Sequence, residues 1–144
     1  MARREAQTRL RTRRLGYTAA EYLAQAWRAL AEAEDTGRGA GTELRYVAAH
    51  LAALRCAAAV LAVRGRPARR RPGTAWAELA ETAPELAGWA TVFAASARVR
   101  SIVESGLHGA VSEHDVAALC ATVAEFLVQV EEVCAGQPAL PRAS

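Results

Sequence analysis

Apolar residues recur along most of the chain at the three- and four-residue spacing of an amphipathic helix, and strand-like alternation is nearly absent. The first helical segment begins at a capping box formed by Thr18 and Glu21, and it ends at the glycines of residues 37–41. One face of this helix is predicted to point inward, and it carries Tyr22, Leu23, Ala26, Trp27 and Leu30.

A second helix is predicted from Thr42 to about Val63. It cannot continue through residues 64–73, because Pro67 and Pro72 each disfavour helical backbone at the residue before them. An arginine-rich loop should therefore follow the helix directly. The positions predicted to face inward are Leu44, Val47, Leu51, Leu54, Ala58 and Leu61.

A short helix and a longer one are predicted next. Thr74 starts the short helix, which closes near Pro84, and Pro84 then serves as a first-turn proline for a helix reaching about Ser105. The inward positions of the longer helix include Leu86, Trp89, Phe93, Ala97 and Val103.

The last helix is predicted to start at a cap formed by Ser112 and Asp115 and to stop at Gly136 and Pro138. Its inward stripe must pack on the helices bearing Leu51, Leu54 or Phe93, or on a second subunit. Short loops favour packing within the chain. The stripe consists of Val116, Leu119, Val123, Phe126, Val130 and Val133.

These segments predict one all-α domain, a single antiparallel helical bundle of four to five helices over residues 18–135. A basic, mobile segment is expected at residues 1–17, and a C-terminal tail at residues 136–144.

The positive charge of the chain is concentrated in residues 1–17 and in the arginine-rich loop. Because the net charge of the whole chain is only +3, the remaining residues together carry a net negative charge. A basic loop can be merely solvated, or it can contact RNA, DNA or an acidic protein surface. The candidate phosphate-binding residues are Arg64, Arg66, Arg69, Arg70 and Arg71.

The three cysteines of the chain form no C-x-x-C pair, which favours free thiols in a reducing cytoplasm. The most apolar stretch contains His50 and Arg55, and these disfavour a membrane span. Nucleotide-binding glycine loops and zinc-protease motifs are absent from the sequence. His108 and residues 113–115 have metal-ligand side chains, but Asp115 is better explained as a helix cap. We therefore expect no metal and no cofactor.

The second predicted helix opens with Arg45-Tyr46-Val47-Ala48-Ala49-His50, in which four residues separate an arginine from a histidine. This spacing resembles the ribonuclease motif of HEPN domains, which are small helical bundles. The chain is most similar to a small actinobacterial branch of that superfamily. The similarity covers about residues 18–132, and it rests on residues 45–55, 60–62, 64–67, 75–76 and 85–89.

The resemblance implies two alternative functions. HEPN ribonucleases pair two copies of the motif across a homodimer and cleave RNA without a metal. In such an enzyme Arg45 would stabilise the phosphate, and His50 would transfer a proton or orient the 2′-hydroxyl. The other alternative is a non-catalytic binding or adaptor module for a nucleic acid or a partner protein.

The residues themselves favour the non-catalytic alternative. Residues five apart on a helix point about 140° away from each other, so Arg45 and His50 do not naturally share a site. The family motif usually has a polar residue after the arginine, where this chain has Tyr46. His50 also lies beside the predicted apolar stripe, so we expect a partly buried histidine whose hydrogen bonds are satisfied.

Overall fold

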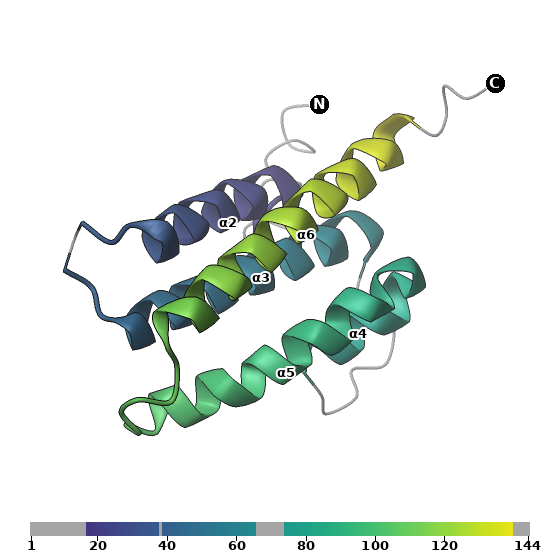
Figure 1. The fold of residues 1–144 in the computed structure, drawn as a ribbon. Helices are drawn as coiled ribbons and strands as arrows, with labels where there is room; N and C mark the ends of the chain where they lie inside the picture. The colour runs from purple at the N-terminus through teal and green to yellow at the C-terminus, as the bar shows by residue number, and fades with distance from the viewer. Residues whose placement is uncertain (1–16, 38, 66–73, 140–144) are drawn as a thin grey trace.

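A computed structural model describes residues 17–37, 39–65 and 74–139, and these residues form helices and loops without a strand. The predicted all-α bundle is confirmed (Figure 1). In chain order the elements are α2 (Ala19–Glu34), α3 (Thr42–Arg64), α4 (Ala75–Thr82), the 3₁₀ helix η1 (Pro84–Leu86), α5 (Ala87–Glu104) and α6 (Glu113–Ala139).

Helix α3 is the central element of the bundle, because α2, α4, α5 and α6 all pack against it. Figure 1 shows α6 running across α3, with α5 on the far side of α6 from α2. By length and composition, α3 could cross a membrane, with a mean hydropathy of 1.8 over its most apolar stretch. More than half of that stretch is buried inside the bundle, so its apolar residues are those of a core helix.

The predicted starts of α2, α4 and α6 are confirmed by their hydrogen bonds, whereas Pro84 opens the 3₁₀ helix η1 and α5 begins three residues later at Ala87. Thr18 and Glu21 form the reciprocal capping box of α2. The Thr74 hydroxyl accepts a hydrogen bond from a backbone N–H in the first turn of α4. At the start of α6 the Ser112 N–H donates to the Asp115 carboxylate, and the Asp115 N–H donates to the Ser112 hydroxyl. The local sequence therefore places these helix starts correctly.

Four aromatic rings from three helices form the centre of the core. The Phe93 and Phe126 ring centroids lie 4.9 Å apart, and Trp76 and Trp89 pack against both rings. The predicted stripe of α6 is buried from Val116 to Val130, and Val133 is half-buried. This stripe therefore packs within the chain, as expected.

The predicted inward face of α3 is wrong at two positions, since Leu44 is 68% exposed and Leu51 is 37% exposed. A helix surrounded on several sides has no single apolar stripe, and five of the eleven buried residues of α3 are alanines. The prediction for Trp27 is also wrong, because this side chain is 44% exposed. Helix α2 packs most extensively on α3, and the contact is rich in alanine. The alanines buried on these two helices are Ala26, Ala29, Ala33, Ala49, Ala52, Ala53, Ala57 and Ala59.

The predicted stop of the last helix at Gly136 is also wrong, because α6 continues to Ala139. A glycine costs a helix only about 1 kcal/mol relative to alanine, which does not by itself end it. The proposed mobile segment, apart from Tyr17, lies outside the described residues, as do Arg66 and residues 69–71 of the basic loop.

Candidate functional site

His50 lies on the inner side of α3 and is 1% exposed. Its Nδ1 is 2.8 Å from the Ser96 hydroxyl oxygen on α5, and that hydroxyl donates to the backbone carbonyl of Phe93. Because the single hydroxyl proton is used there, Nδ1 must be the donor toward Ser96. The imidazole also packs edge-on against Trp76. His50 is therefore a buried, hydrogen-bonded histidine that joins α3 to α5.

Burial lowers the pKa of His50 to about 4, and the nearby positive charge of Arg100 acts in the same direction. The imidazole is consequently neutral at physiological pH. A general acid or base works best with a pKa near the operating pH, so this environment is a poor one for proton transfer.

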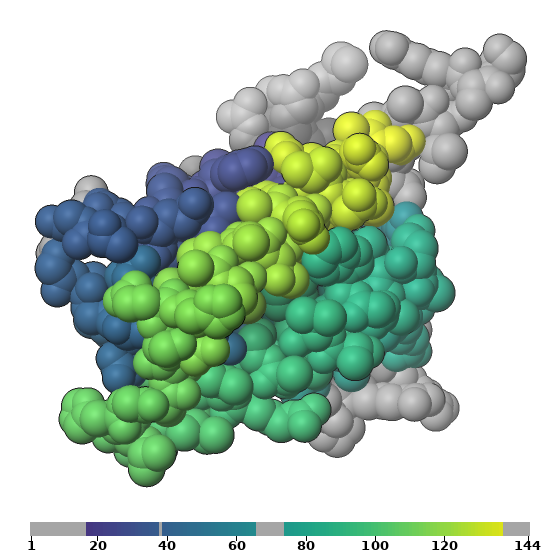
Figure 2. All heavy atoms as spheres, viewed as in Figure 1, coloured from purple at the N-terminus to yellow at the C-terminus, as the bar shows by residue number. Residues whose placement is uncertain are grey.

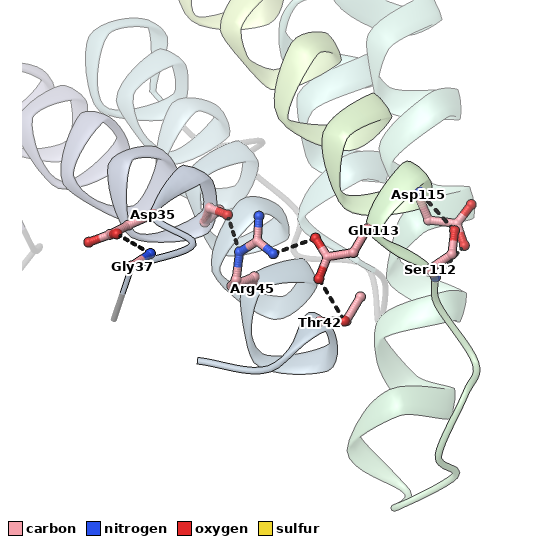
Figure 3. Close-up of polar contacts among 8 residues, drawn as sticks. Asp35, Gly37, Thr42, Arg45, Ser112, Glu113 and Asp115 are labelled. Carbon is pink, nitrogen blue, oxygen red and sulfur yellow. Dashed lines mark hydrogen bonds and ion pairs between the residues drawn. The ribbon is translucent and has the colours of Figure 1, made fainter. Parts of the chain in front are cut away.

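Arg45 lies one turn from the start of α3, and it is 7% exposed. Its Nε donates to the carbonyl of Ala33 near the end of α2 at 2.8 Å, and its Nη1 donates to Glu113 at the start of α6 at 2.6 Å (Figure 3). The other carboxylate oxygen of Glu113 accepts from Thr42 at 3.0 Å. Arg45 thus ties together the ends of three helices.

The same end of the bundle has further polar connections. The Glu43 carboxylate accepts from the backbone N–H of Gly109, which fixes the loop between α5 and α6. Hydrogen bonds from Arg45 and Thr42 lower the pKa of Glu113, and those from backbone N–H groups lower the pKa of Glu43. Both carboxylates are therefore held in their charged form.

The structure does not bring Arg45 and His50 into one site. Arg45 bonds toward α2 and α6, while His50 bonds toward α5. Neither side chain is open to solvent, and both have protein partners. The two residues of the sequence motif therefore occupy separate structural positions in this chain.

Arg64 lies at the end of α3, where the basic loop begins. Its two terminal nitrogens donate to the two carboxylate oxygens of Glu85, at 2.6 and 2.8 Å. This bidentate pair lowers the pKa of Glu85 and raises that of Arg64. Arg64 therefore anchors the start of the loop to η1, and its charge is already balanced.

Sequence reasoning missed Glu113 and Ser96, the partners of the two motif residues. Each lies more than 40 residues from its partner along the chain, so no local pattern indicates the pairing. Within the described ranges, no group of three or more histidine, cysteine or acidic side chains could hold a metal ion. Cys56 and Cys120 are buried free thiols, and burial raises the pKa of both.

Comparison with known proteins gives one family. Residues 37–131, well over half of the chain, match the family model described as SAV_6107-like HEPN. No curated protein and no solved structure gives a significant match. The matched region begins just before α3 and ends within α6, so it includes both motif residues and their side-chain partners Glu113 and Ser96.

Proposed function

Because the chain belongs to the SAV_6107-like HEPN family, we propose that it is a HEPN-type binding module that does not cleave RNA. The observation that carries this proposal is the structural use of both motif residues. His50 is 1% exposed and bonded to Ser96, and Arg45 is bonded to Ala33 and Glu113. A catalytic pair needs access to the phosphate and to the 2′-hydroxyl, which neither side chain has in this fold.

Exposing His50 to a substrate would disrupt the core. Its ring lies against Trp76, and its hydrogen bond joins α3 to α5. Moving it would break this buried hydrogen bond, although the Ser96 hydroxyl would keep its bond to the Phe93 carbonyl. The same argument applies to Arg45. Turning its guanidinium group toward a phosphate would break its hydrogen bonds to the Ala33 carbonyl and to Glu113.

Incubating the full-length protein with total RNA in EDTA tests this proposal. We expect the RNA to remain intact at high protein concentration. Cleavage by the wild type that is lost in both His50→Asn and Arg45→Lys, with both variants still folded by circular dichroism, would establish the ribonuclease alternative. The control is His108→Gln, which changes an exposed histidine, and cleavage that persists in all three variants would identify a contaminating nuclease.

The partner that we propose first is a nucleic acid, bound through the basic segment of residues 64–71. Five arginines occur within these eight positions, and such clusters bind phosphates with a strong dependence on salt. Arg64 is engaged by Glu85, so the proposed contacts belong to the other four arginines, which lie outside the described residues.

Fluorescence anisotropy with single-stranded RNA and duplex DNA across a salt series tests this partner. Replacing Arg69, Arg70 and Arg71 with glutamine should flatten the salt dependence, by up to about 0.7–0.9 in the log–log slope for each phosphate contact removed. Arg64→Gln is the matched control and should leave the slope nearly unchanged. A wild type that binds neither nucleic acid would favour a protein partner instead.

We also propose that the protein acts in the cytoplasm, which suits its buried free thiols. If two copies pair, the inward stripe of α6 is not their interface, because this stripe is buried within one chain. Sedimentation velocity on the full chain measures the oligomeric state directly.

A further inference from the structure

A cavity of about 370 Å³ opens between α5 and α6, beside the first turns of α3. This volume is at the lower end of the range for small-molecule sites. Figure 2 shows the face of the molecule on which α6 and α5 lie next to each other. The walls of the cavity come mainly from α5 and α6. They include Val92, Ala95, Val99, Ala118 and Leu119.

Tyr46 supplies a hydroxyl group to this cavity. The side chain lines the cavity and is only 6% exposed, yet its hydroxyl has no hydrogen-bond partner among the described residues. The hydroxyl oxygen is not one of the fully buried polar atoms without a partner, so water reaches it through the opening of the cavity. Ser96 also lines the cavity, but its hydroxyl is already engaged by His50 and Phe93. The Tyr46 hydroxyl is thus free to bind a ligand.

The electrostatics of the cavity favour a positive charge. Asp115 is the one lining residue, among those described, that carries a charge at neutral pH. Its hydrogen bonds with Ser112 lower its pKa and keep it ionised. Burial and this nearby carboxylate raise the pKa of Tyr46. The nearby Arg100 is paired with Glu104 on its own helix, at 3.2 Å.

We propose that the cavity binds a small cationic amphiphile, namely a primary amine with a compact apolar body. The apolar part lies between Val92, Val99 and Leu119, and the ammonium group faces Asp115. An ammonium donates hydrogen bonds and accepts none, so it matches a carboxylate and the lone pairs of the Tyr46 hydroxyl. Phosphate-bearing ligands are repelled by the same carboxylate. The site is independent of the nucleic-acid binding proposed above.

Three probes that share one apolar body but differ in charge separate the contribution of the apolar contacts from that of the charge. They are 2-phenylethylamine, the neutral 2-phenylethanol and the anionic phenylacetate, each titrated into the full-length protein and followed by NMR chemical shifts. We expect the amine to bind at least about tenfold more tightly than phenylacetate, with 2-phenylethanol between them. The shifts should map to Tyr46, Val92 and Leu119.

Variants then assign the binding to this cavity. Ala118→Leu fills it from an exposed position and should abolish binding, whereas Ala121→Leu, on an exposed part of α6 that does not line the cavity, should not. Asp115→Asn keeps a capping side chain but removes the charge, so the amine and the alcohol should then bind within about twofold of each other. Tyr46→Phe should weaken the binding of the amine several-fold.

Three results would overturn the proposal. The first is the absence of any shift with the amine at millimolar concentration while the thermal melt shows a folded protein. The second is binding of the amine that Ala118→Leu leaves unchanged, because the amine would then bind elsewhere. If sedimentation shows a dimer that Ala118→Leu dissociates, a second copy of the chain occupies the groove, and the proposal is wrong.

Discussion

The two halves of the bundle are held together by different means, and only α6 takes part in both. Toward the start of α5, Trp76, Trp89, Phe93 and Phe126 join α4, α5 and α6 through ring contacts. At the other end, where α3 begins, the helices are joined by hydrogen bonds and the Arg45–Glu113 ion pair. The polar end borders an open cavity.

Aromatic contacts in one half mainly stabilise the fold, whereas polar contacts in the other half mainly fix the positions of the helix ends. Aromatic packing is non-directional and scales with the apolar area that is buried, so it stabilises the fold strongly. Polar contacts with exposed partners add less free energy but fix geometry. The Glu113 side chain is 65% exposed, for example, although Arg45 beside it is almost buried. We expect mutations in the two halves to differ accordingly.

The largest expected effect is in the aromatic half. Phe126 has no exposed surface, so Phe126→Ala should lower the free energy of unfolding by about 3–5 kcal/mol. The loss should not depend on protein concentration, because the ring packs within the chain. Urea denaturation at two protein concentrations measures the loss in the free energy of unfolding and shows whether that loss depends on concentration. Val128→Ala, at a half-exposed site on the same helix, should change stability by no more than about 0.5 kcal/mol. An equal loss of stability in both variants would contradict the assignment of Phe126 to the core and of Val128 to the surface of α6.

His50 lies between the two halves, and its effect depends on pH. Its folded pKa of about 4 is below the ordinary value of 6.5, so the unfolded chain binds more protons between these values. Stability should therefore fall as the pH decreases from about 6.5 to 4, by about 3 kcal/mol in total. His50→Asn keeps a donor toward Ser96 but cannot titrate.

Urea denaturation at pH 7.0 and pH 4.5 compares the wild type with this variant. The wild type should lose more stability than His50→Asn over the interval, and the difference between them isolates the histidine from the acidic side chains. Equal losses would show that the imidazole is hydrated and not buried as described.

A smaller, asymmetric effect is expected at the polar end. Arg45→Met keeps the buried length of the side chain but leaves the Ala33 carbonyl without this donor, at a cost of about 1–3 kcal/mol. Glu113→Gln should be the milder change, because that carboxylate is mostly exposed and water can replace its partners. Thermal melts of the two variants measure the asymmetry. A larger loss in Glu113→Gln would mean that the ion pair, and not the Ala33 hydrogen bond, dominates this end.

Local sequence signals were sufficient for the helix starts and for one core face. Thr18, Thr74 and Ser112 cap helices as predicted, because capping depends on residues within one turn. The stripe of α6 was also predictable, since this helix has one buried face. The same reasoning failed for Leu44 and Leu51, because α3 is surrounded and buries alanines on several sides. In an alanine-rich chain those positions do not stand out.

The site could be predicted only in part. His50 was expected to be partly buried and hydrogen-bonded because it lies beside apolar residues, and the structure buries it almost completely with Nδ1 bonded to Ser96. Its partner Ser96 and the partner of Arg45, Glu113, depend on how distant helices meet. The cavity arises in the same way, from the placement of α5 and α6 around Tyr46. No periodicity in the sequence contains that information.

The alanine-rich contact between α2 and α3 has a consequence for how this core responds to change. An alanine side chain has no rotamers, so burying it costs no side-chain conformational entropy. The same property leaves the contact without alternative packings, because nothing at Ala26, Ala33 or Ala53 can rotate aside. A larger residue at any of these positions has to separate the two helix backbones. The contact is therefore inexpensive to form and intolerant of enlargement.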